Sequence, residues 1–214
     1  MRGTQFCIWA TQKLREYIVK GFVLDDERLS DGQVAKTYFQ ELEERIRKVR
    51  TSEANFYQKV RDIFVTSVDY NPQVDYAKKF FAMVQNKFHY AITGLIASEI
   101  VNNRINSDKQ NLGLTNWSGE IITRDQAEIA KNYLEELELK RLNLLVEQFL
   151  SYAELQSVEE RLMYMRDWIN ELNNFLTFNR KNISANAGSV SHENMENKFR
   201  SELAKYNQKR LERK

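Results

Sequence analysis

Proline and glycine are scarce in this chain, and their scarcity restricts the fold more than any other feature of the sequence. The 214 residues include one proline and seven glycines. Because these two residue types break helices and punctuate turns, a chain with so few of them favours long helices with few interruptions. The sequence therefore predicts an all-α fold, an irregular multi-helix bundle of about seven or eight helices with one long loop insertion near residues 106–122.

Apolar residues recur at helical spacing and predict where the helices lie. The predicted helices cover residues 6–20, 34–64, 75–90, 95–104, 125–134, 135–156, 163–183 and a final segment after residue 191, with residues 22–32 as a loop. The first has an apolar face made of Ile8, Trp9, Leu14, Tyr17 and Ile18. Residues 34–64 form either one continuous helix or two, in which case Thr51 and Ser52 cap the second.

Local signals mark three of the predicted helix boundaries. Thr93 and Gly94 are expected to kink or recap the helix between residues 90 and 95. Thr123 and Gln126 have the spacing of a capping box, which opens a helix by reciprocal hydrogen bonds. Ser191 is a suitable cap for the last helix.

The charge and the cysteine content exclude several classes of protein. The 32 basic and 30 acidic residues leave a net charge of +2, without the basic excess typical of proteins that hold nucleic-acid backbones. The single cysteine, Cys7, excludes an intramolecular disulfide. One cysteine and two histidines do not provide the spacing of a metal-binding motif. The sequence has neither a secretory signal nor an apolar run long enough to cross a bilayer, so no membrane partner and a cytoplasmic location are predicted.

The segment from residue 80 to residue 104 carries the best candidates for a functional site. Gln85 and His89 are four residues apart and project from one helix face, flanked by Asn86 and Lys87. An imidazole titrates near neutral pH and can transfer protons. This polar stripe is therefore either a catalytic or ligand-binding edge, or a set of structural hydrogen bonds to a neighbouring loop.

Glu99 and Arg104 follow on the next predicted helix. Ten residues along one straight helix would separate His89 from Glu99 by about 15 Å, so the two side chains meet only if the chain folds back between them. The alternative is a solvated helix face. The candidate catalytic residues are His89 as acid/base, with Glu99, Asn86, Lys87 and Arg104 in support.

The loop near residues 106–122 carries Trp117, which is expected to be either a lid over a site or a packing anchor. Lys131 and Asn132 follow this loop and are placed to face it. The candidate ligand-binding residues are Gln85, Trp117, Lys131 and Asn132.

Signatures of common enzymes are absent from the sequence. It has no GxxxxGK[ST] phosphate loop, no GxGxxG turn, no HExxH helix and no GxSxG elbow, and we predict no metal and no cofactor. The C-terminal region is locally basic and is either a nucleic-acid contact or a solvated last helix. Its basic residues are Lys198, Arg200, Lys205, Lys209, Arg210, Arg213 and Lys214.

Several phrases of the sequence resemble one known family. In chain order they are FYQKVRDIFVTSVDYNP, FFAMVQNKFHYAITG, NLGLTNWSG, AKNYL, YAELQ, MRDWINELNNFL and NAGSVS. Over nearly its whole length the chain is similar to the bacterial virulence-associated RhuM family. The resemblance implies a virulence-associated protein linked to mobile elements, and it brings no established biochemical activity.

The first residues, RGTQFCIWATQKLREYIVKG, resemble the end of the N-terminal segment of longer family members, where a DNA-binding region similar to Bro-N and KilA-N domains precedes it. The resemblance implies three parts: residues 1–30 as the tail of a DNA-binding-type segment, 31–188 as the helical RhuM-like domain and 189–214 as a basic C-terminal helix. The part that reads DNA is expected to be missing here, by natural or engineered truncation.

Two functions are compatible with these observations. The first is a non-enzymatic interaction or effector domain, tethered to DNA in the full-length protein, which binds a protein partner or a second copy of itself. It predicts an exposed apolar patch or a dimer through the long helices. The second is a toxin-like enzyme, a nuclease or a nucleotide-modifying enzyme, which needs the candidate side chains around His89 to converge in a pocket beside Trp117.

Overall fold

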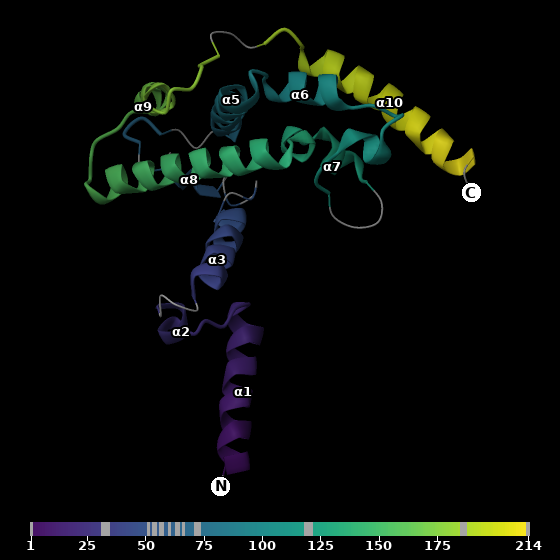
Figure 1. Cartoon of the computed structure of the whole chain (residues 1–214). Helices are drawn as coiled ribbons and strands as arrows, with labels where there is room; N and C mark the ends of the chain where they lie inside the picture. Colours follow the sequence, from purple (N-terminus) through teal and green to yellow (C-terminus); the bar gives the residue numbers. More distant parts are fainter. Residues whose placement is uncertain are drawn as a thin grey trace. The chain divides into compact units, whose positions relative to one another are not determined.

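The structure, a computed structural model, has helices as its only regular elements in the residues that it describes, and the expected all-α class is confirmed (Figure 1). The described residues are 2–30, 35–50, 74–117, 122–184 and 188–212, with positions 52, 55, 58, 59, 61, 62, 65 and 67–70 between them. The chain divides into two compact units, residues 1–46 and residues 47–214.

The described helices are α1 (Arg2–Lys20), α2 (Asp26–Ser30), α3 (Ala35–Arg50), α5 (Val74–Thr93), α6 (Ala97–Arg104), η1 (Gln110–Gly113), α7 (Arg124–Glu128), η2 (Ala130–Tyr133), α8 (Glu136–Val158), α9 (Met165–Phe178) and α10 (His192–Glu212), where η denotes a 3-10 helix. Several predicted segments differ. The helix expected over residues 6–20 begins at Arg2, and the helix expected over residues 163–183 ends at Phe178. The expected loop 22–32 contains α2, and the expected helix 125–134 is divided by Ile129, whose extended backbone separates α7 from η2.

The break after α3 favours two helices rather than one continuous helix in residues 34–64. α3 ends at Arg50 and Ser52 lies in a bend. The Ser52 hydroxyl and the Asn55 side-chain amide both donate to the Val49 carbonyl, at 2.9 and 2.8 Å, and so satisfy a carbonyl that the helix end leaves unpaired. Thr51, the other expected capping residue, lies outside the described residues.

The long loop insertion near residues 106–122 is also found. Between α6 and α7 the described chain contains only η1, which carries two non-glycine residues with positive φ, Asn111 and Leu112. Residues 118–121 lie outside the described part.

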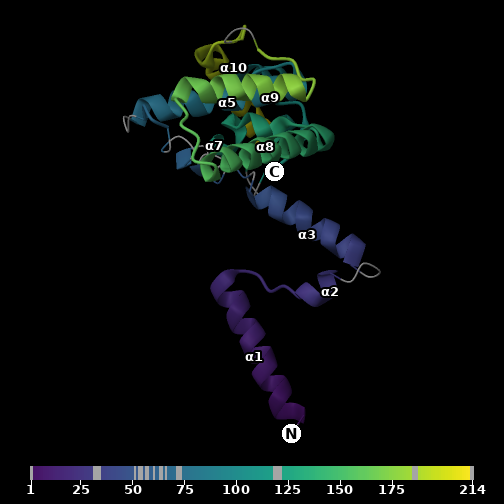
Figure 2. The same ribbon diagram turned by 90° about the vertical axis from the view of Figure 1, so that its left-hand side faces the viewer.

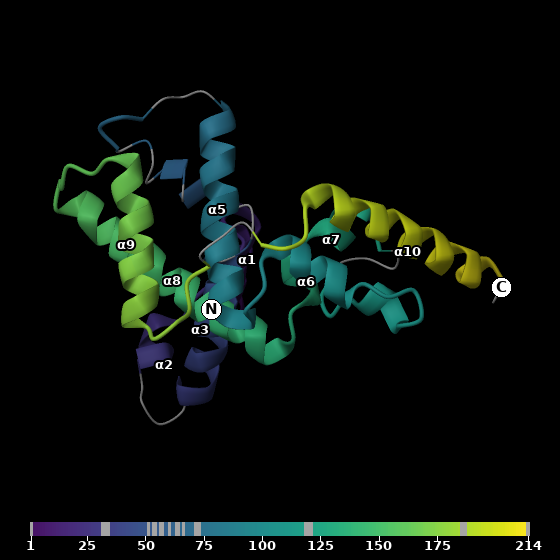
Figure 3. The same ribbon diagram turned by 90° about the horizontal axis from the view of Figure 1, so that it is seen from above.

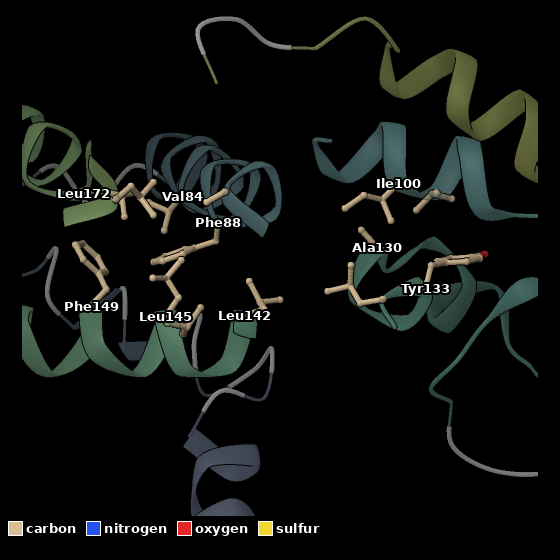
Figure 4. Close-up of a cluster of buried hydrophobic side chains, with 14 of the residues drawn as sticks. Val84, Phe88, Ile100, Ala130, Tyr133, Leu142, Leu145, Phe149 and Leu172 are labelled. Carbon is tan, nitrogen blue, oxygen red and sulfur yellow. The ribbon is translucent and has the colours of Figure 1, made fainter. Parts of the chain in front are cut away.

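The core of the second unit forms where α5 and α9 pack against α8. Figure 3 shows α5 and α9 side by side, and Figure 4 shows their side chains directed toward α8. Phe88 meets Phe149 edge-on at 5.7 Å between ring centroids, and Phe149 also meets Phe175 at 5.5 Å. Burial of each large apolar side chain contributes about 1.5–3 kcal/mol. The apolar residues whose spacing of three and four predicted these helices are therefore the residues that form the buried core.

A second group of buried side chains lies between α6, η2 and α10, and Figure 4 shows Ile100 of α6 above Ala130 and Tyr133. The Tyr133 hydroxyl donates to the Ala127 carbonyl at 2.8 Å, which satisfies its buried polar end. α10 lies beside α6 (Figure 1) and buries Phe199 completely. The C-terminal helix is therefore packed into the second unit.

The first unit has no comparable core. It consists of α1, α2 and most of α3, and none of its described side chains is buried. Val23, Leu29, Tyr38 and Leu42 surround a hollow of about 320 Å³ between α2 and α3. α1 extends away from these elements, and Figures 1 and 2 show no other helix of its unit along its length.

Candidate functional site

At residues 93–94, where a kink or a recapping was predicted, α5 ends and the chain continues into α6. α5 ends at Thr93, whose hydroxyl donates to the His89 carbonyl at 2.9 Å and accepts from the Leu95 amide at 3.0 Å. Gly94 has φ +74°, a conformation that favours glycine. Across the junction, Asn86 Oδ1 accepts from the Ala97 amide, the first of α6, at 3.0 Å. Asn86 therefore ties α5 to α6 by satisfying an unpaired amide at the α6 start.

Glu99 has a structural set of partners. Its Oε1 accepts from the Ser189 amide and hydroxyl, both at 2.7 Å, and its Oε2 accepts from the Ile96 amide at 3.0 Å. The Ser189 amide, followed by that of Ile96, holds the pKa of this carboxyl below its usual value. Glu99 thus caps α6 and fixes the segment before α10, and none of these partners is His89, with which it was grouped as a catalytic candidate.

Arg104 joins α6 to the start of α8. Its two terminal nitrogens donate to both oxygens of Glu138, at 2.5 and 2.7 Å, and one of them also donates to the Tyr133 carbonyl at 2.8 Å. The paired carboxylate raises the pKa of Arg104, and the guanidinium lowers that of Glu138. A forked pair of this kind fixes the relative position of two helices.

His89 lies at the wall of a cavity of about 370 Å³ in the second unit, formed by residues from α5, α6, α7, η2 and α8. Only 5% of the residue is exposed. Burial, with a smaller contribution from the positive charge of Lys131, lowers the pKa of His89 to about 4. The imidazole is therefore neutral at physiological pH, because an apolar environment disfavours its charged form.

The cavity brings together only part of the predicted set. Gln85, His89 and Lys131 line it, whereas Asn86, Lys87, Glu99, Arg104, Trp117 and Asn132 are not among its lining residues. Partial burial lowers the pKa of Lys87. The convergence beside Trp117 that the enzyme hypothesis requires is not seen among the described residues.

Asn143 of α8 is a cavity residue that the sequence analysis missed. It is 7% exposed, and its Oδ1, like Nδ1 of His89, is buried without a hydrogen-bond partner in the described part of the chain. An unpaired buried polar atom costs about 1–3 kcal/mol. The sequence signal that could have identified Asn143 was a polar amide side chain between Leu142 and Leu145, on an otherwise apolar helix face.

Trp117 lies in the loop near residues 106–122, and Asn132 of η2 is hydrogen-bonded to that loop. Trp117 is 38% exposed and is not part of the buried core. The Asn132 carbonyl accepts from the amides of Thr115 and Asn116, at 2.8 and 3.2 Å, and its side-chain amide donates to the Gln126 carbonyl at 2.7 Å. The capping box that opens α7 is present as predicted, with Gln126 donating to Thr123 Oγ1 at 3.3 Å.

Two of the phrases that carry the family resemblance contact each other. Asp69 Oδ1 accepts from the Met165 amide at 2.8 Å, and the Trp168 indole donates to the Ser67 hydroxyl at 3.2 Å. Asp69 thus satisfies the first amide of α9, and these two contacts hold the SVDY and MRDW segments together.

The basic residues of α10 are largely engaged in pairs within the chain. Lys198 donates to the Asn102 carbonyl at 2.5 Å, Arg200 pairs with Glu196 at 2.6 Å, and Lys209 pairs with Asp108. Ser191 caps the helix as predicted by accepting from the Asn194 amide at 3.2 Å. Nucleic-acid contact through this helix stays a prediction, and Arg213 and Lys214 lie outside the described residues.

α1 presents the most extensive exposed apolar surface of the first unit. We name Phe6, Trp9, Ala10, Leu14 and Tyr17 the α1 stripe, because their spacing of three and four residues places them on one helix face. Its four large side chains are each more than half exposed, and the rings of Phe6 and Trp9 lie 5.9 Å apart. Ile8 was predicted for the same face but lies on the opposite face of α1. Nine residues separate it from Tyr17, which is about two and a half helical turns, so the two side chains point in opposite directions.

The fold and these sites define an all-helical protein with one packed unit, one unit that exposes an apolar helix, and no group of metal-ligating side chains among the described residues. The chain belongs to the Virulence protein RhuM family, whose family model matches residues 1–214. This membership makes it a virulence-associated protein. No curated protein and no solved structure matches the chain. Within the described residues, no helix combines the length and apolar character that a membrane crossing requires.

Proposed function

We propose that this chain is the interaction module of a virulence-associated protein, and that it pairs with a second copy of itself through the α1 stripe. The observation that carries the proposal is the exposure of the stripe: Phe6 is 64%, Trp9 56%, Leu14 61% and Tyr17 59% exposed. Aromatic side chains are enriched in the anchoring positions of protein interfaces. An exposed, contiguous apolar patch on one helix face favours a protein partner.

The size of the first unit supports association. A 19-residue helix of which no described side chain is buried is marginally stable in water, because most helix stability in proteins comes from packing of an apolar face. Small units bury a low fraction of their surface, and below about 40 residues they usually need disulfides, metals or association; the first unit, residues 1–46, is close to this limit. The only cysteine in the chain is Cys7, and the described residues contain no group of metal ligands. Association is therefore the remaining means of stabilising the first unit.

The spacing within the stripe favours a second copy as the partner. Phe6 and Tyr17 are equally far from the midpoint between Thr11 and Gln12, and Trp9 and Leu14 are also equally far from it. In an antiparallel pair centred there, Phe6 of one copy faces Tyr17 of the other, and Trp9 faces Leu14. Such a self-complementary patch is what a two-fold symmetric interface requires.

The strength of this pairing is expected to be modest. Aromatic side chains bury about 150–250 Å² each, so two stripes together approach the lower end of stable interfaces, about 1,200 Å² in total. We therefore expect a dimer that forms in the micromolar concentration range.

The proposal includes a tether to DNA in longer family members, where a DNA-binding-type segment is implied to precede the region that corresponds to α1. An antiparallel pair would place the two helix starts about 28 Å apart, the length of 19 helical residues. This distance is close to one turn of DNA, about 34 Å, which separates the half-sites of many dimeric DNA-binding proteins.

Sedimentation velocity on the full chain across the micromolar range tests the pairing. The variant Phe6→Ser/Tyr17→Ser removes two stripe residues. The matched control, Ile8→Ser/Val19→Ser, removes two exposed apolar residues from the opposite face of α1. We expect the wild type and the control to dimerise and the stripe variant to stay monomeric. A wild type that is monomeric throughout, or a control that dissociates as readily as the stripe variant, contradicts the proposal.

A further inference from the structure

We infer that the cavity at His89 is a binding site for a small, uncharged, amino-substituted heterocycle of the adenine type. The cavity lies within the second unit and goes beyond the pairing of α1, which involves the first unit alone. Its volume of about 370 Å³ lies within the range of small-molecule pockets, about 300–1,000 Å³.

The walls of the cavity have the composition of a ligand site. Phe88, Leu142 and Val146 supply apolar surface, and the aromatic ring provides a face on which a planar ring can pack. His89 and Asn143 add polar groups from two different helices, α5 and α8. Mostly apolar walls with a few convergent polar groups are typical of sites that bind and orient small molecules.

One buried polar atom in each of these two side chains lacks a hydrogen-bond partner among the described residues. His89 is 5% and Asn143 7% exposed, and neither His89 Nδ1 nor Asn143 Oδ1 makes a hydrogen bond within the described residues. Because an unpaired buried polar atom destabilises a fold, a protein that keeps two of them at one cavity is expected to use them. Neither atom has accessible surface, so a ligand reaches them after rotation of the soft terminal torsions of the two side chains.

The chemistry of these groups selects the class of ligand. Asn143 Oδ1 accepts hydrogen bonds, and His89 Nδ1 accepts them in the tautomer that carries its proton on Nε2. A carboxamide also pairs with adenine in a bidentate manner, because its oxygen and nitrogen match the amino group and the neighbouring ring nitrogen. The ligand is therefore expected to donate N–H groups from a planar ring.

The charges around the cavity disfavour an anion. Asp125 and Glu128 are among the lining residues, against the single ammonium of Lys131. Glu128 is already paired with Arg124 at 2.7 Å. With the imidazole neutral, the lining carries more negative than positive charge. A free phosphate is consequently expected to bind less well than an uncharged ring.

Ligand-observed NMR with adenine as the probe, on the full chain, tests this inference, with inorganic phosphate as the second probe. Asn143→Leu removes the amide at nearly constant volume. Asn173→Leu is the matched control, because Asn173 Oδ1 is also buried without a partner but belongs to α9 and not to the cavity. We expect adenine, but not phosphate, to bind the wild type and the control, and to bind Asn143→Leu about tenfold more weakly.

The melting temperature of each variant without adenine shows that it is folded, and both leucine variants are expected to melt at or above the wild-type temperature. If Asn143→Leu does not fold, His89→Leu replaces it, with the same expected loss of binding. Adenine that fails to bind the wild type, or that binds equally well after the loss of Asn143 or His89, overturns the inference. The unpaired atoms would then be satisfied by water alone.

Discussion

Replacing His89 by leucine is expected to remove most of the loss of stability that we predict for this protein between pH 7.5 and pH 5. In the folded chain, burial lowers the pKa of His89 from 6.5 to about 4. Because the folded pKa lies below the unfolded one, the unfolded chain takes up a proton as the pH falls through 6.5 while the folded chain does not. The His89 contribution is therefore complete above pH 6.5 and is lost as the pH falls toward 4.

The size of the effect follows from these two pKa values. At pH 5 the unfolded imidazole is nearly fully protonated and the folded one is still nearly neutral, so linkage removes about 2 kcal/mol of unfolding free energy relative to pH 7.5. Buried carboxylates contribute little in this window. Glu99 and Glu138 have lowered pKa values, so their contributions are present above pH 4.5 and are lost only below it.

Urea denaturation of the wild type and of His89→Leu at four pH values between 7.5 and 5 measures the loss, with fluorescence of the buried Trp168 as the readout for the second unit. His192→Gln is the matched control, because His192 is the only other histidine and is exposed at the start of α10. The control is expected to keep the wild-type dependence. A wild type equally stable at both pH values, or a His89→Leu variant that still loses about 2 kcal/mol, refutes the reasoning.

Two further predictions concern the contacts that hold the second unit together. Arg104→Ala is expected to lower the unfolding free energy by about 2 kcal/mol in urea denaturation, because it leaves Glu138 unpaired. This value lies between those of exposed and of fully buried ion pairs. A change below about 0.5 kcal/mol would show that the pair is not formed. Gly188→Ala is expected to cost about 3 kcal/mol, because φ is +87° and the new Cβ would lie 2.3 Å from Cδ1 of the buried Ile96. Gly94→Ala, with φ +74° and nothing within 4 Å, is expected to cost only about 1 kcal/mol, and equal losses in the two alanine variants would contradict the packing of residue 188 on α6.

The boundaries of the helices were predictable where the signal is local. Gly94 ends α5 and Thr123 opens α7 because each acts on amides or carbonyls within four residues of itself. The core of α8 was also predictable, since its apolar residues repeat with the helical period.

The long-range polar contacts were not predictable from one sequence. Glu99 binds Ser189, 90 residues further along the chain, and Asp69 binds Met165, 96 residues away. Nothing local to either carboxylate identifies its partner, so Glu99 was placed with His89 as a catalytic candidate. Asn143 was missed for the opposite reason, because its neighbours in sequence are apolar and its environment is set by four other elements, α5, α6, α7 and η2.

Disulfide cross-linking tests the proposed pairing of α1 most directly. Phe6→Cys and Tyr17→Cys chains, each with Cys7→Ser, are mixed in equal amounts and oxidised, and the products are identified by mass spectrometry. In an antiparallel pair residue 6 faces residue 17, whereas the two copies of residue 6 are about 16 Å apart along the helix axis, too far for a disulfide. Pairing as proposed gives a product that joins residue 6 to residue 17. A product that joins residue 6 only to residue 6, or no cross-linked product at all, contradicts it.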